Sequence, residues 1–146
     1  MARRILHPTD FSRASGAAFA RAVAEAKANR ASLLIVHVLA PVIPVVSEGY
    51  VSPSVYQQMA AAGRGWAQKQ LNRLLARART ARVRVRGMLL EGVAHEAIVR
   101  AARRQRADLI VIGTHGRTGV ARFFLGSIAA RVTASAPCPV LTVRGR

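Results

Sequence analysis

The sequence predicts a single α/β domain built on a parallel β-sheet. Continuous apolar runs alternate along the chain with segments of helical periodicity, in the order strand, helix, strand. Such runs are buried on both faces, which is typical of the inner strands of a parallel sheet. The chain has 146 residues and is 51% hydrophobic, so it can form one domain with a substantial core. The connections are expected to be right-handed crossovers, with helices on both faces of the sheet.

Five strands are predicted from apolar patterning. The run at residues 5–6 is short, those at 33–36 and 109–112 are continuous, and residues 139–143 close the chain. Residues 82–86 differ, because arginine and valine alternate strictly, so that one face meets the core and the other meets water. Charged alternation protects an edge strand from unwanted pairing, and this strand is therefore expected at a margin of the sheet.

Helical periodicity fills the segments between the strands. The predicted helices cover residues 12–30, 55–80, 93–106 and 127–133. Ser12 is the expected N-cap of the first helix, and a leucine-rich stripe that includes Leu71 and Leu75 gives the second helix its buried face. Residues 39–54 contain three prolines and one glycine and are expected to form a loop.

The net charge of +17 is the most unusual property of the composition. The chain has 23 basic and 6 acidic residues, and all the basic ones except Lys27 and Lys69 are arginine. Arginine binds phosphate, so nucleotides and nucleic acid are candidate partners. The arginines are spread over almost every segment and aromatic residues are few, which favours a compositional excess over a dedicated nucleic-acid site. Non-specific binding of nucleic acid at low salt is still expected.

Cysteine content and hydropathy predict a soluble, cytoplasmic protein. Cys138 is the single cysteine, so no internal disulfide can form, and an inert packed thiol is expected there. Polar residues at 7–10 interrupt the apolar start before a signal peptide could form. The apolar stretch at 39–46 is too short to span a bilayer.

The carboxyl ends of the strands are the expected location of a ligand site in an open parallel sheet. Residues 7–10 follow the first strand and Val38 follows the second. After Ile112, at the end of the fourth strand, comes the glycine-rich segment 113–119. Gly126 and Ser127 then begin the last helix.

That glycine-rich segment has the chemistry of an anion site. Glycines let backbone amides approach an anion closely, and a helix N-terminus adds free N–H groups and the positive end of its dipole. Ser127 adds a hydroxyl donor and Arg117 a cation. The first strand is not followed by the G-x-G-x-x-G fingerprint, and G-x-x-x-x-G-K-[ST] does not occur, so a dinucleotide-dependent dehydrogenase or a P-loop ATPase is disfavoured.

These motifs together resemble the universal stress protein family. The spacing Gly113-x2-Gly116-x9-Gly126-Ser127 matches the G-x2-G-x9-G-[ST] motif of the ATP-binding members. The flanking segments 107–112 and 136–141 and the opening 5–12 are similar to the family as well. The resemblance spans nearly the whole chain and is weakest over residues 41–80.

The resemblance implies a Rossmann-like sheet of the adenine nucleotide α-hydrolase type, with strand order 3-2-1-4-5. It also implies ATP as ligand, with Mg²⁺ as an accompanying ion, and a homodimer through the last strand, Val140–Val143. Asp10 would contact the ribose or, through a cation, the phosphates. The remaining implied contacts are Pro8, Thr9 and the Val38 main chain around the adenine, and Gly113, Gly116, Gly126, Ser127, Ile128 and Ala129 around the ribose and phosphates. Ile112 is a further implied contact to the nucleotide.

Several residues keep a structural interpretation beside the functional one. Asp10 is either a ligand contact or a helix cap, and Arg117 and Arg122 either bind phosphate or belong to the arginine excess. The histidines at 7, 37 and 115 are interpreted as structural and no metal site is predicted. Met59 and Trp66 are expected in the core or in an interface.

The acidic residues predict that the protein is not an enzyme, or that it hydrolyses ATP slowly at most. Phosphoryl transfer requires carboxylates that hold a metal ion, and only Asp10, Glu48 and Glu91 are expected near the crevice. A basic nucleic-acid-associated protein without a nucleotide ligand remains the alternative function.

Overall fold

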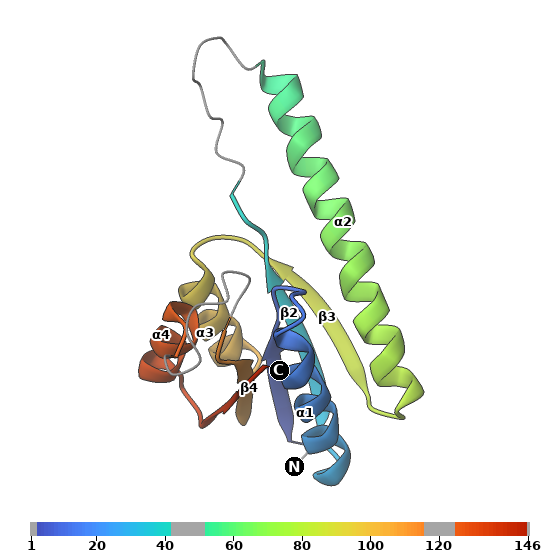
Figure 1. Ribbon diagram of the computed structural model, residues 1–146, viewed down its shortest axis with the longest axis vertical. Helices are drawn as coiled ribbons and strands as arrows, with labels where there is room; N and C mark the ends of the chain where they lie inside the picture. Colours follow the sequence, from blue (N-terminus) through green and yellow to red (C-terminus); the bar gives the residue numbers. More distant parts are fainter. Residues whose placement is uncertain (1–2, 42–51, 116–124, 146) are drawn as a thin grey trace.

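A five-stranded parallel sheet runs through the centre of the computed structural model (Figure 1), which describes residues 3–41, 52–115 and 125–145. The strands are β1 (Arg4–Pro8), β2 (Ser32–Val38), β3 (Val85–Leu90), β4 (Leu109–Gly113) and β5 (Val140–Val143). Their order is β3-β2-β1-β4-β5. The fold class and the strand order predicted from the sequence are confirmed, including the edge position of the third strand.

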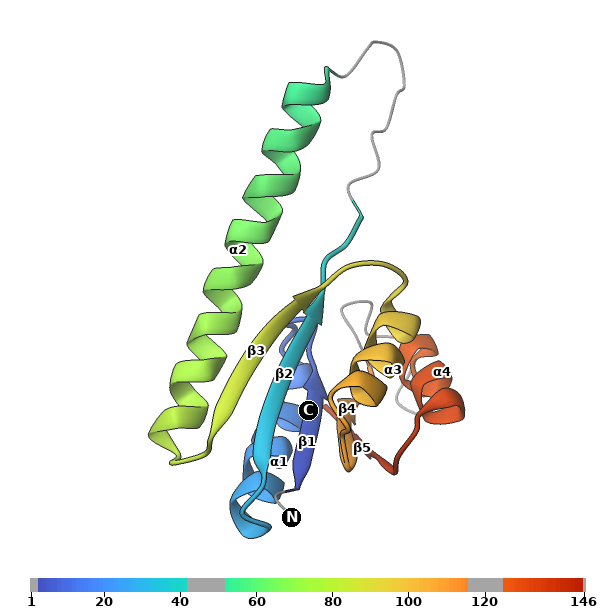
Figure 2. The same cartoon turned by 180° about the vertical axis from the view of Figure 1, so that it is seen from behind.

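Two helical layers enclose the sheet (Figures 1 and 2). The helices are α1 (Ser15–Ala28), α2 (Pro53–Thr80), α3 (Ala94–Arg104) and α4 (Ser127–Ser135). Ile5 packs with Phe19 of α1 and Leu71 of α2 on one face, whereas Leu6 packs with Ile98 of α3 and Val132 of α4 on the other. Successive residues of β1 therefore pack into the cores on opposite faces of the sheet. For this reason the strand is continuously apolar and does not alternate apolar with polar residues.

The predicted third strand at 82–86 is displaced in the structure, where β3 begins at Val85. The amide of Val83 donates to the carbonyl of Ala78, 3.1 Å away, so residues 81–83 belong to the turn that ends α2. Val83 is buried in this turn as it would be in a strand, which explains the error.

The first helix begins at Ser15, and the prediction of residue 12 with Ser12 as N-cap is wrong. Asp10 Oδ1 accepts a hydrogen bond from the Ser12 amide at 2.9 Å, and Ser12 Oγ accepts one from the Ser15 amide at 3.2 Å. Two side-chain turns thus precede the helix, and the N-cap residue is Ala14. Asp10 is consequently not a cap of α1.

The amino-terminal half of α2 extends beyond the sheet (Figures 1 and 2). Met59 and Trp66 are 55% and 46% exposed, so they do not belong to the core, and the alternative that they lie in an interface stays a prediction. Leu71 and Leu75, further along the helix, are buried as predicted. No helix of the described chain is both long and apolar enough to cross a membrane.

Three helix-to-strand turns end in the same motif, with an arginine in the left-handed region. Arg30, Arg82 and Arg106 have φ angles of 51°, 63° and 52°. In each turn the amide of the next residue donates to the carbonyl five residues back, as in Ala31 N to Ala26 O at 2.8 Å, which is the Schellman arrangement. Three residues after each arginine come Leu33, Val85 and Leu109. In the sheet Leu33 pairs with Val85, and Ile5 pairs with both Leu33 and Leu109, so these positions are level. We therefore call the three arginines the arginine row.

Replacement of the arginine row by glycine is expected to stabilise the protein. An L-residue at positive φ suffers a clash of its Cβ that glycine avoids, so each change should add about 1 kcal/mol to the free energy of unfolding. Urea unfolding followed by circular dichroism measures the gain. The matched Arg→Ala variants keep the Cβ and should show no gain; equal effects of glycine and alanine would contradict the strain argument.

Candidate functional site

A cavity of about 350 Å³ opens at the carboxyl edge of the sheet, where the strand order reverses between β1 and β4. Its volume lies in the range of small-molecule sites. All the predicted site residues that the structure describes line it: Pro8, Thr9, Asp10, Val38, Ile112, Gly113, Gly126, Ser127, Ile128 and Ala129. Gly116, Arg117 and Arg122 lie outside the described residues.

The turn after β1 holds Asp10 at the cavity wall. The Thr9 amide donates to Val36 O at 2.9 Å, which ties the turn to β2. Thr9 Oγ1 accepts from the Phe11 amide at 3.0 Å and lies 3.1 Å from Ser15 Oγ, within hydrogen-bonding distance. Together with the Asp10–Ser12 bond, these contacts fix the direction of the chain, so the carboxylate of Asp10 has a defined position at the carboxyl edge.

An aromatic cluster connects this turn to α2. Phe11 has a φ of 62°, and its ring centroid lies 4.3 Å from that of His37 and 5.7 Å from that of Trp66. His37 Nδ1 is 2.8 Å from Thr9 O; because a carbonyl oxygen only accepts, this nitrogen carries the proton. A left-handed non-glycine residue beside a cavity is typical of a functional site.

Backbone amides form the opposite wall, at the start of α4. The Gly126 amide donates to Thr114 O at 2.6 Å, and a Cβ on Gly126 would lie 2.7 Å from the same oxygen. Close packing therefore requires glycine here. The first intrahelical bond runs from Ala130 N to Gly126 O, so the amides at 127–129 precede the hydrogen-bonded helix and present the positive dipole end to an anion.

The cavity walls carry little of the protein's positive charge. Among the lining residues of the described chain there is no lysine or arginine, although the net charge is +17. An anion in the cavity would therefore meet amides, hydroxyls and a helix dipole rather than fixed cations. In the described part of the molecule, the arginine excess and the lining of this cavity are therefore separate features.

Acidic residues are as sparse in the cavity as basic ones. Asp10 is the acidic residue that lines it, whereas Glu91, predicted near the crevice, forms an ion pair with Arg64 at 2.5 Å beside a neighbouring groove. Glu48 lies outside the described residues. Within the described chain no three His, Cys, Asp or Glu residues are grouped as metal ligands.

Sequence reasoning missed part of the cavity wall. The additional lining residues are Ser15, Val36, His37, Ala94, Ile98, Thr114 and His115. Thr114 and His115 belong to the glycine-rich segment that the sequence singled out, so proximity to its glycines is a usable signal. Ala94 and Ile98 come from α3 and only the packing of that helix reveals them.

His7 is a structural residue beneath the carboxyl edge. Its ring is fully buried, and Nδ1 donates to Val111 O at 2.8 Å, while Nε2 has no hydrogen-bond partner in the described chain. Burial lowers the pKa of His7 from its ordinary 6.5 to about 4, against smaller opposing effects of the Val111 bond and Asp10. The ring is therefore neutral at pH 7.

The thiol of Cys138 is half-buried beside the core that contains Leu6 and Ile110. Burial, followed by the nearby carboxylate of Asp108, raises its pKa, so the reactive thiolate is disfavoured. The structure thus places Cys138 as the packed thiol that the sequence predicts.

Acidification is expected to destabilise the protein through His7. Between pH 6.5 and 4 the unfolded chain binds a proton at His7 that the native state excludes, so the free energy of unfolding falls as the pH is lowered, by about 3 kcal/mol in total. Urea titrations at pH 7.5 and 4.5 measure the loss. His7→Gln, which cannot be protonated, should lose less stability over the same interval; an equal loss in both proteins would refute the assignment.

Comparison with known proteins places this geometry in a family. The sequence profile described as "Universal stress protein family" matches residues 1–144. A universal stress protein of Thermus aquaticus is 40% identical over 144 residues, covering 99% of this chain and all of that protein. UspA from Lactobacillus plantarum has a TM-score of 0.82 at 26% identity over 97% of both chains. A universal stress protein in complex with cAMP has a TM-score of 0.74 at 28% identity, over 99% of this chain and 98% of its own. The chain belongs to the universal stress protein family.

Proposed function

We propose that this protein binds an adenine nucleotide, with ATP as the expected ligand, and acts as a stress-response or signalling module. The observation that carries the proposal is the cavity at the strand reversal, which joins Asp10 to the amide-bearing start of α4. Ligands of open parallel sheets bind at this place. A relative of 28% identity whose structure contains cAMP supports the same ligand class.

The lining of the cavity includes groups suited to each part of a nucleotide. Val36, Ile98 and Ile112 supply apolar surface suited to a purine, near the Val38 main chain. The amides at 127–129 and the Ser127 hydroxyl suit phosphate groups, which the helix dipole stabilises. Asp10 would contact either the ribose or a Mg²⁺ ion bound to the phosphates. Neither contact requires a second carboxylate.

The same proposal includes a homodimer formed through β5. This strand, Val140–Val143, is the last in the sheet order and pairs with β4 on one side. An open strand edge exposes backbone donors and acceptors that a second copy of the chain can pair.

ATP is expected to raise the melting temperature of the purified protein. At a concentration of about 100 times Kd, a ligand that binds only the native state adds about 2.7 kcal/mol, or roughly 5 to 10 °C for a chain of this size. Differential scanning fluorimetry measures the shift, with inorganic triphosphate as the control anion. No shift with ATP, or an equal shift with triphosphate, would refute adenine-nucleotide binding. Mass spectrometry of the denatured protein identifies any nucleotide that copurifies.

Gly126→Ala tests the amide wall within the same experiment. Its Cβ would collide with Thr114 O and displace the start of α4, so ATP affinity should fall about tenfold or more, equivalent to about 1.4 kcal/mol. Gly65→Ala is the matched control, since its methyl group meets no atom within 4 Å. Unchanged affinity in Gly126→Ala would show that phosphates do not bind at this wall.

Hydrolysis of ATP is expected to be slow, with fewer than about 1 turnover per second, because Asp10 is the lone carboxylate in the described cavity wall. Phosphate release in the presence of Mg-ATP measures it. Asp10→Asn serves as the control for contaminating ATPases. Turnover between about 1 and 10³ per second that Asp10→Asn abolishes would make the protein an enzyme.

A further inference from the structure

We propose that the amino-terminal edge of the sheet, opposite the nucleotide cavity, binds the phosphodiester backbone of nucleic acid through the arginine row. The row consists of Arg30, Arg82 and Arg106, which occupy equivalent turns before β2, β3 and β4. This inference is independent of the proposed nucleotide function, because the two sites lie at opposite edges of the sheet.

The sheet register sets the spacing of the row. Ile5 pairs with both Leu33 and Leu109, and Leu33 pairs with Val85, so the starts of the four strands are level. Neighbouring strands lie about 4.8 Å apart, so the row extends over roughly 14 Å of the edge. A duplex carries one phosphate per about 3.4 Å of each strand, so a row of this length faces several phosphates.

The guanidinium groups of the row are available to a ligand. All three residues are exposed, and in the described part of the chain none of their side chains forms a hydrogen bond or an ion pair. Other arginines are engaged: Arg21 pairs with Glu25, and Arg64 pairs with Glu91. The row therefore differs from arginines that serve intramolecular contacts.

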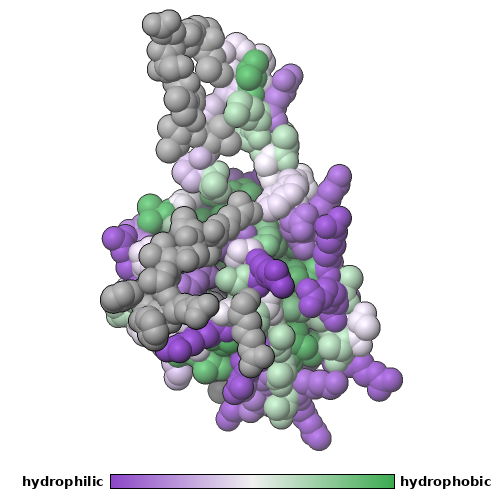
Figure 3. Space-filling model, viewed as in Figure 1, coloured by the Kyte–Doolittle hydropathy of each residue, from purple (hydrophilic) through white to green (hydrophobic). Residues whose placement is uncertain are grey.

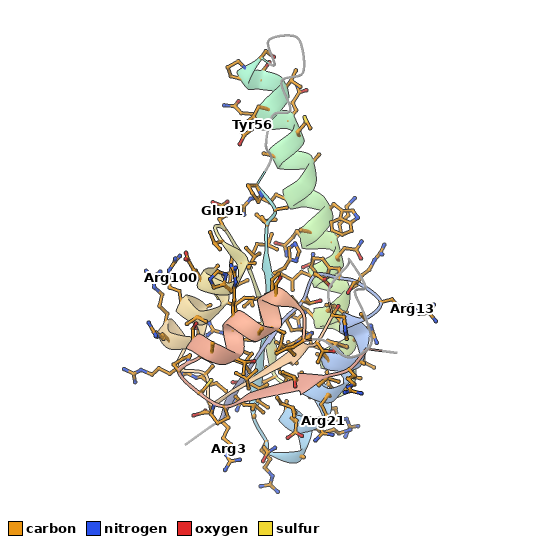
Figure 4. The ribbon with its side chains drawn as sticks, turned by 60° about the vertical axis from the view of Figure 1, so that its left-hand side comes forward. Arg3, Arg13, Arg21, Tyr56, Glu91 and Arg100 are labelled. Carbon is orange, nitrogen blue, oxygen red and sulfur yellow. The ribbon has the colours of Figure 1, made fainter. Side chains whose placement is uncertain are left out.

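Charge around the row is strongly positive. Arg4 begins β1 at the same edge and Arg3 precedes it; Figure 4 shows Arg3 at the end of the molecule away from Tyr56 and Glu91. Two acidic residues lie nearby. Asp108 accepts the Arg4 amide at 2.8 Å, and Glu25, which pairs with Arg21, accepts from Asn29 beside Arg30. In Figure 3 hydrophilic side chains project from the lower end of the molecule, which is the end that holds Arg3 in Figure 4.

Helix termination alone does not account for arginine at these three positions. Glycine is the usual residue at a left-handed helix end, and arginine there carries backbone strain. A cation near a helix C-terminus offsets that strain, but the last turns already hold basic residues: Lys27, Arg77, Arg79, Arg103 and Arg104. The helices therefore do not require the positive charge of these three side chains, which indicates that the row binds an external anion.

Phosphate in a polymer fits this surface better than a small ligand does. Arginine binds phosphate oxygens through two parallel N–H groups, and three such groups along an edge match a repeating anion. The described edge offers a row rather than an enclosed cavity, and base-stacking aromatics are scarce. Binding should therefore be independent of sequence and strongly dependent on salt.

The experiment compares two triple variants with equal loss of charge. Arg30→Gly, Arg82→Gly and Arg106→Gly together remove the row and relieve its strain, so weaker binding cannot be ascribed to unfolding. Arg73→Gln, Arg100→Gln and Arg131→Gln remove three exposed arginines elsewhere. Fluorescence anisotropy with a labelled duplex of random sequence measures affinity over a range of salt concentrations, with ATP present to occupy the cavity.

The row variant should bind the duplex at least about tenfold more weakly than the control variant at low salt. The slope of log K against log salt should become shallower by about 0.9 for each arginine removed. Equal weakening in both variants would overturn the proposal, since the binding would then be diffuse. Absence of duplex binding by the unaltered protein would also overturn it, as would row-dependent binding to phosphatidylserine vesicles without binding to the duplex.

Discussion

The central strand β1 is hydrogen-bonded on both sides and buried on both faces, and this constraint positions the rest of the molecule. It pairs with β2 on one side and with β4 on the other, so the chain builds β2 and β3 outward on one side of β1 and then returns to add β4 and β5 on the other side. The crossovers on the two sides then leave in opposite directions, which opens a crevice at the carboxyl edge. His7, inside the same strand, is fully buried and donates to Val111 O across this pairing.

The cavity illustrates how a strongly basic protein can present an anion-compatible surface whose described lining contains no arginine or lysine. Its described walls consist of apolar residues, hydroxyls, the imidazoles of His37 and His115, a single carboxylate and the amide end of α4. Amides held by packing keep their direction, whereas exposed arginine side chains lose conformational entropy when they are fixed. The arginines instead occupy surfaces and turns, where their charge remains solvated.

Continuous hydrophobic runs predicted most of the fold, because a strand that is buried on both faces of a sheet must be apolar at every position. The ends of elements were less predictable, since local hydrogen bonds decide them. Val83 and Val85 alternate with arginines, yet the bond from Val83 to Ala78 places the first valine in a turn. The glycine spacing located the cavity, but the contribution of Ile98 depends on how α3 packs across the sheet.

The aromatic cluster beside the cavity gives the protein an optical property of its own. The chain contains one tryptophan, and only the ring of Phe11 separates its indole from His37 in the cavity wall. A rearrangement of that wall would move the ring of Phe11, which meets the indole of Trp66 on α2 edge-on at an interplanar angle of 83°. The intrinsic emission of Trp66 therefore reports on the state of the cavity without any attached dye.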